Sequence, residues 1–236
     1  MKNRLIIISA VIFVTAEIAL SIGLQTTRGD TSAALSYSAI AISCLFCLFL
    51  FTKTVDYVCT QLGLVLTLFA DYFLVLAERQ EQIPAMICFS LTQIFYFIRL
   101  YNSHESHVSR RVHLLVRVAL IAMALLLTVA VLGEGADTLS LVSLFYYANL
   151  IMNLIVAFTQ TRRSILLPVE LALFLLCDTV VGLNVMAESY IQSFDNTALH
   201  RLLNPGFNLA WVFYVPSQVL IPLSLIELRS ERKTAP

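Results

Sequence analysis

The chain has 236 residues, of which 59% are hydrophobic and 13% charged; its formal net charge is zero and its mean hydropathy is +0.84. Soluble domains contain about 45–50% apolar and about 25% charged residues, so this composition excludes an ordinary water-soluble domain. The zero net charge also excludes the basic footprint of a nucleic-acid-binding protein, and we expect no nucleic-acid partner.

The apolar residues form eight blocks, each close to the roughly 20 residues that a helix needs to cross a bilayer. The blocks occupy residues 5–24, 33–52, 56–77, 82–101, 112–132, 137–159, 164–186 and 207–227. The first block is longer than a signal-peptide core, so we expect it to be retained as a helix. Most connectors are short, so successive helices should be antiparallel neighbours. The sequence therefore predicts an all-α bundle, a single integral membrane domain over residues 1–236 that is multi-pass in the cell membrane.

Lysine and arginine are distributed unevenly between the two ends of these blocks. One side receives Lys2, Arg4, Lys53, Arg99, Arg110, Arg111, Arg117, Arg162, Arg163, Arg229, Arg232 and Lys233, and the other receives Arg28, Arg79 and Arg201. Cytoplasmic loops of membrane proteins carry the excess of Lys and Arg. This asymmetry requires an even number of spans and predicts that both termini are cytoplasmic.

The cysteines lie inside or at the edges of the apolar blocks, at Cys44, Cys47, Cys59, Cys88 and Cys177. Their odd count and membrane positions argue against a disulfide framework. The pair Cys44 and Cys47 has no second Cys or His pair nearby to complete a metal site, so we interpret both as small apolar residues of a buried helix.

Several polar side chains fall where lipid or the bundle interior is expected. A carboxylate at the centre of a spanning helix costs about 2.5–3.5 kcal/mol on insertion scales, which makes such residues functional candidates. Counted at 1.5 Å per residue, six of them share a depth of roughly 10–18 Å below the outer boundary. We call these residues the polar layer: Glu17, Asp71, Asn149, Asp178, Tyr214 and Gln218. Their shared depth predicts a polar cavity between the helices.

Two carboxyl groups in a dry cavity can divide the work of a general acid and a general base, because burial and mutual repulsion favour different protonation states. Structural hydrogen bonding and an ion or proton path are the alternatives. The histidines (His104, His107, His113 and His200) lie in loops or at helix ends, which disfavours a zinc hydrolase. The sequence has no G-x-S-x-G or HExxH motif, so a triad hydrolase is disfavoured as well.

Four segments resemble motifs of the YhhN-like lysoplasmalogenases. They are Lys53-Thr54, residues 68–74 (LFADYFL), residues 174–182 (FLLCDTVVG) and residues 211–218 (WVFYVPSQ). The resemblance covers nearly the whole chain, because the number of spans and the chain length also fit.

The resemblance implies an enzyme that hydrolyses the vinyl-ether bond of a lysoplasmalogen, without a metal or other cofactor. It implies Asp71 and Asp178 as the catalytic acid pair, without deciding which is the acid. Candidate substrate-binding residues are Lys53, Tyr96, Asn149, Tyr214, Gln218 and Glu17. Lys53 matches a family motif, but a topology-setting role at its end of the bundle is the stronger interpretation. Expected partners are a lysophospholipid and the bilayer, and the alternative function is a non-catalytic transporter, sensor or scaffold.

Overall fold

The computed structural model describes residues 2–77, 81–102, 108–160, 164–190 and 197–234, and this part of the chain is helical without strands. The helices are α1 (Lys2–Thr26), α2 (Asp30–Phe49), α3 (Val55–Asp71), α4 (Gln82–Asn102), α5 (Arg110–Leu132), α6 (Thr138–Phe158), α7 (Leu166–Tyr190), α8 (Ala198–Leu203) and α9 (Leu209–Thr234). A π-helical turn, η1 (Tyr72–Leu76), continues α3, and a 3-10 turn, η2 (Gly133–Gly135), follows α5. Within the described residues, eight helices are long and apolar enough to span a membrane, which confirms the predicted fold class.

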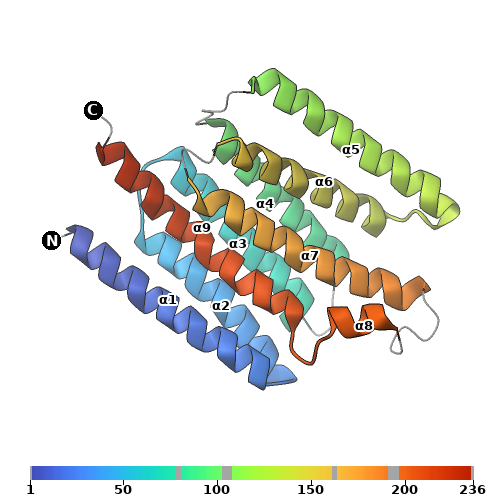
Figure 1. Cartoon of the computed structure of the whole chain (residues 1–236), viewed down its shortest axis with the longest axis horizontal. Coiled ribbons are helices and arrows are strands. Elements are labelled where there is room, and N and C mark those ends of the chain that lie inside the picture. The colour runs from blue at the N-terminus through green and yellow to red at the C-terminus, as the bar shows by residue number, and fades with distance from the viewer. Residues whose placement is uncertain (1, 78–80, 103–107, 161–163, 191–196, 235–236) are drawn as a thin grey trace.

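The helices are aligned in one bundle whose edges are α1 and α5 (Figure 1). Only 17% of the α1 span and 11% of the α5 span are buried inside the bundle, against 39–44% for the other spans. The centre is formed by α3, α4, α6, α7 and α9, with the most extensive packing between α7 and α9 and between α3 and α4. The peripheral helices therefore offer most of their surface to lipid, whereas the central ones hold the polar residues.

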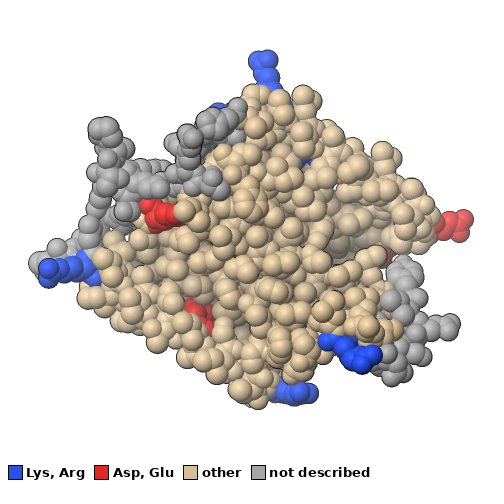
Figure 2. All heavy atoms as spheres, in the orientation of Figure 1, with Lys and Arg blue, Asp and Glu red and all other residues tan. Residues whose placement is uncertain are grey.

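Both termini lie at the same end of the bundle, as an even number of spans requires (Figure 1). The face seen in Figure 2 is almost free of charge, with Lys and Arg at its margins. Many large apolar side chains of the described residues are exposed, for example Val131 at 77% and Ile12 at 64%, which would be unfavourable in water. Such a belt matches the hydrocarbon region of a bilayer. Which end faces the cytoplasm stays a prediction.

Two connectors differ from the predicted ones. The segment expected as a loop over residues 25–32 is mostly helical, because α1 runs to Thr26 and α2 begins at Asp30, leaving a tight turn at Gly29 with a φ of 66°. The long connector predicted over residues 187–205 contains the end of α7 and the short helix α8. The Thr197 side chain accepts a hydrogen bond from the backbone N–H of His200 and so caps α8, a local signal that hydropathy does not register.

The N-terminus of α7 is held by a carboxylate from α9. Glu227 accepts hydrogen bonds from Ser164 Oγ (2.5 Å), Ile165 N (3.0 Å) and Leu166 N (3.3 Å). The first N–H groups of a helix have no partner within the helix, and a negative charge there is also favoured by the helix dipole. This contact fixes the relative position of the two helices that carry Asp178 and Tyr214. All five cysteines are free, as expected.

Candidate functional site

Asp71 occupies the last position of α3, where the chain passes into the π-helical turn η1. Its side chain is 3% exposed, and its Oδ2 accepts a hydrogen bond of 2.7 Å from the Tyr214 hydroxyl on α9. Single-turn π-helical segments widen a helix locally and occur frequently at functional sites. Here the widened turn follows directly after the buried carboxyl group.

Asp178 forms a second pair of the same kind. It lies on α7, and its Oδ2 accepts a short hydrogen bond from the hydroxyl of Tyr146 on α6. Tyr146 is buried and Asp178 is partly buried. Each predicted catalytic aspartate is thus bound by a tyrosine from a different helix.

The two pairs meet around the buried ring of Phe174. Its centroid is 5.5 Å from that of Tyr214 and 6.5 Å from that of Tyr146. These contacts bring Asp71 and Asp178 to one region of the bundle, although α3 and α7 are far apart in sequence. We call Asp71 and Asp178 with their two tyrosines the acid pair.

Two further predicted residues, Gln218 and Tyr96, lie deeper in the bundle, toward the end that holds the termini. Gln218 follows Tyr214 by one turn of α9; its Nε2 donates to Ser217 Oγ at 3.3 Å, and its Oε1 has no hydrogen-bond partner among the described residues. The Tyr96 hydroxyl on α4 is also buried without a partner in that part of the chain. Both retain hydrogen-bonding capacity that water or a ligand could satisfy.

Glu17 and Asn149 share the depth of the acid pair but have other partners. Glu17 accepts a hydrogen bond of 3.1 Å from Ser43 and joins α1 to α2. The Asn149 side-chain oxygen is bound by the Arg117 guanidinium at 2.8 Å. Glu17 and Asn149 therefore share the depth of the acid pair without bonding to it. Depth along a helix does not specify the direction in which a side chain points.

Arg117 is a buried residue that sequence reasoning assigned only to topology. It is 6% exposed, donates to Asn149 and to Asn153 (2.6 Å), and lies 4.4 Å over the Phe97 ring. Asn153 in turn donates to the backbone and side-chain oxygens of Gln93 at 2.9 Å. This network attaches the peripheral helix α5 to α6 and α4. Its position inside an apolar block is the signal that could have identified it.

Arg99 and Glu170 form a second buried charged set. Arg99 has no exposed surface and donates from Nη2 to Ser224 at 2.7 Å, whereas its Nε and Nη1 have no partner among the described residues. Both Glu170 oxygens likewise lack a hydrogen-bond partner there.

Lys53 is exposed in the connector between α2 and α3. Lys53 lies just before the first turn of α3, whereas Asp71 is the last residue of that helix, so the length of α3 separates them. The structure does not bring Lys53 to the acid pair. In the part of the chain that the structure describes, no three His, Cys, Asp or Glu side chains are grouped as metal ligands.

Residues 34–225 match the model of the YhhN family. The chain belongs to the YhhN family. The matched segment begins inside α2 and ends inside α9, so both halves of the acid pair, with Gln218 and Tyr96, lie within the YhhN region, and Glu17 lies outside it. No curated protein and no solved structure matches the chain.

Proposed function

We propose that this YhhN-family protein is a membrane-embedded hydrolase that cleaves the vinyl-ether bond of lysoplasmalogens. The products would be a fatty aldehyde and glycerophosphoethanolamine or glycerophosphocholine. The observation that carries the proposal is the acid pair: a buried and a partly buried carboxyl group in one region of the bundle, each accepting a hydrogen bond from a tyrosine hydroxyl. Family membership agrees with a hydrolase of this kind.

The chemistry requires one protonated and one ionised carboxyl group. The protonated group transfers its proton to the β-carbon of the vinyl ether, and the double-bond electrons form the new C–H bond. The α-carbon and ether oxygen then share the positive charge of an oxocarbenium ion, which the neighbouring carboxylate stabilises. That carboxylate also takes a proton from water as the water oxygen bonds to the α-carbon.

The hemiacetal formed in this way collapses with the same two groups. The newly protonated carboxyl group returns its proton to the ether oxygen, and the C–O bond to the α-carbon breaks. The other carboxylate takes the hemiacetal hydroxyl proton, which yields the aldehyde and restores the starting protonation state. The residues Asp71 and Asp178 supply both functions, and the hydroxyls of Tyr146 and Tyr214 fix the orientation of the two carboxyl groups.

The test is aldehyde release from a lysoplasmalogen by the purified protein in detergent. Asp71→Asn and Asp178→Asn should each lose activity by at least about 100-fold, the lower range for a general acid or base. Asp56→Asn is the matched control, because Asp56 is a buried aspartate at the opposite end of α3. The proposal fails if the folded parent releases no aldehyde from ethanolamine or choline substrates, or if all three variants retain equal activity.

The buried charges at Arg99 and Glu170 favour a second candidate, a proton-coupled carrier. Ionisable groups buried in series inside a bundle are typical of proton paths, and Glu170 lies between the acid pair and the end of α7 that Glu227 caps. Proton uptake into liposomes that contain the protein, lost in Glu170→Gln, would support the carrier. Aldehyde release without proton uptake would support the hydrolase.

A further inference from the structure

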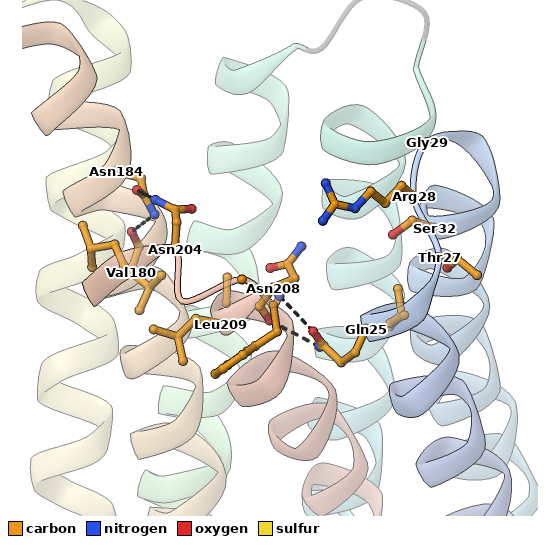
Figure 3. A pocket seen from close by; sticks show the side chains of 15 residues that line it. Gln25, Thr27, Arg28, Gly29, Ser32, Val180, Asn184, Asn204, Asn208 and Leu209 are labelled. Carbon is orange, nitrogen blue, oxygen red and sulfur yellow. Dashed lines mark hydrogen bonds between the residues drawn. The ribbon is translucent and has the colours of Figure 1, made fainter. Parts of the chain in front are cut away.

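A cavity of about 470 Å³ opens at the end of the bundle opposite the termini (Figure 3). We call it the end cavity. Its walls come from the end of α1, the turn before α2, the last turns of α7, and the segment that joins α8 to α9. Helices remote in sequence therefore meet here, and none of the site residues assigned above lines it.

Amide groups fix the walls of the end cavity. Gln25 Nε2 donates to the Asn208 carbonyl at 3.3 Å, and the Asn208 N–H donates to Gln25 Oε1 at 2.8 Å, which joins α1 to the start of α9. On the other side, Asn204 donates to Asn184 Oδ1 at 2.9 Å. Figure 3 shows these two bonded pairs on separate walls. Each wall is thus fixed by hydrogen bonds between residues that line the cavity.

Arg28 is the one charged residue among those that line the end cavity. Its guanidinium projects from the turn after α1 toward the space facing Asn184 and Asn204 (Figure 3). Across the described parts of the chain, it has no hydrogen-bond or ion-pair partner. A guanidinium presents a planar fork of donors that suits a phosphate oxygen pair, and a positively charged polar cavity favours an anionic ligand.

Two of the helices that line the end cavity also carry residues of the acid pair. Val180 lines the cavity and follows Asp178 by two residues on α7, and Ala210 lines it and precedes Tyr214 by four residues on α9. At 1.5 Å per residue, the inner lining is therefore roughly 3–6 Å from the acid pair along the bundle axis. Leu24, Leu203 and Leu209 supply apolar walls. The depth between the inner lining and the acid pair is thus about the length of a glycerol unit.

We propose that the end cavity binds the phosphate-bearing headgroup of the lysophospholipid substrate, with Arg28 as the partner of the phosphate. This inference rests on the proposed function and adds the recognition of the headgroup to it. The glycerol backbone extends inward from the cavity and places the vinyl ether between Asp71 and Asp178. An alkenylglycerol without phosphate is then a poor substrate, because Arg28 has nothing to bind.

The test separates binding from catalysis. Trp211 is the only tryptophan of the chain; its backbone N–H bonds to the Asn208 side chain at 3.4 Å and its ring centroid is 5.2 Å from that of Tyr214, so its fluorescence reports on ligands bound between the end cavity and the acid pair. A 1-alkyl-glycerophosphoethanolamine, whose saturated ether cannot be cleaved, is titrated in a non-ionic detergent beside the 1-alkylglycerol of the same chain length. Free glycerophosphoethanolamine is added as a competitor, to distinguish a site for the lipid from one for the soluble phosphodiester.

The variants are Arg28→Gln and Arg28→Lys, with Arg201→Gln as the control. Arg201 is an exposed arginine on α8 at the same end of the bundle, outside the cavity lining. The parent and the control should prefer the phosphate-bearing lipid by at least about tenfold, as one charge-assisted contact provides. Arg28→Gln should lose that preference, and Arg28→Lys should restore part of it.

The inference is overturned if the parent shows no preference, if Arg28→Gln keeps the preference, or if Arg201→Gln loses it equally. Tighter binding of the free phosphodiester than of the lipid overturns it as well. Activity distinguishes this failure from that of the proposed function. A parent that hydrolyses lysoplasmalogen with a KM unaffected by Arg28→Gln refutes the headgroup site alone. A parent that releases no aldehyde but binds the phosphate lipid through Arg28 refutes the hydrolase alone.

Discussion

Replacement of Gly63 by alanine tests the close approach of α3 and α4, the helices that carry Asp71 and Tyr96. A Cβ at Gly63 would lie 2.6 Å from Tyr96 Cε1 and 3.2 Å from its Cζ. Carbon atoms in favourable contact are about 3.5–4.0 Å apart, so the ring or the helix must move by about 1 Å. Tyr96 has no exposed surface and therefore no solvent space to move into. Overpacking of this kind lowers the free energy of unfolding by about 1–3 kcal/mol.

The same substitution also stabilises the helix, because alanine is favoured over glycine inside a helix by about 1 kcal/mol. This gain must be separated from the loss of stability that the clash causes. Gly182 in α7 supplies the control, since a Cβ there meets no heavy atom within 4 Å. Both substitutions gain the same helix propensity. We therefore expect Gly63→Ala to be about 1–3 kcal/mol less stable than Gly182→Ala.

The assay is unfolding from maltoside micelles by titration with SDS, followed by circular dichroism. Adding Tyr96→Leu to Gly63→Ala should recover part of the lost stability, because it removes the clashing ring atoms, and the double-mutant cycle measures this coupling. Equal stability of Gly63→Ala and Gly182→Ala would refute the close approach of the two helices.

Three other perturbations address the site and its supports. Tyr146→Phe and Tyr214→Phe each remove a hydroxyl that binds an aspartate and should lower kcat for aldehyde release by about 10- to 100-fold, from the roughly 1.5–3 kcal/mol of such a bond; unchanged kcat in both would contradict their positioning role. Arg117→Met leaves two buried amide oxygens unpaired and should lower the free energy of unfolding by about 2–5 kcal/mol in the SDS titration, whereas exposed Arg110→Met should not. Glu227→Ala removes the acceptor for three donors at the start of α7 and should cost about 1–3 kcal/mol in the same titration; wild-type stability would show that the contact is not formed.

The spans could be predicted from the sequence because crossing a bilayer imposes a length and a composition that each segment shows by itself. Hydropathy singles out carboxyl groups inside apolar blocks, among them Glu17, Asp71 and Asp178, and it was the resemblance to the family that selected the two aspartates as the acid pair. The tyrosine that binds each aspartate could not be assigned, because this depends on the rotation and packing of α6 and α9. The π-helical turn after Asp71 likewise has no hydropathy signal.

Arg99 and Arg117 show what a count of charges leaves out. Both were assigned to the cytoplasmic side because they lie near the ends of apolar blocks, yet both are buried among helices. A positive-inside count treats each arginine as a loop residue and contains no information about a partner such as Asn153 or Ser224. Glu17 shows the limit of counting depth, because its depth placed it in the polar layer with Asp71 and Asp178, while its hydrogen bond is to Ser43.

The measurement that tests the central claim most directly is deuterium incorporation during turnover of a lysoplasmalogen in D₂O. If a carboxyl group of the acid pair protonates the vinyl β-carbon, the aldehyde carries a single solvent deuterium on the carbon beside its carbonyl group, detected by mass spectrometry after immediate borohydride reduction. The account predicts this product from the parent and from Asp56→Asn, and none from Asp71→Asn or Asp178→Asn. Aldehyde without deuterium, or labelled aldehyde from both acid-pair variants at the parent rate, would contradict it.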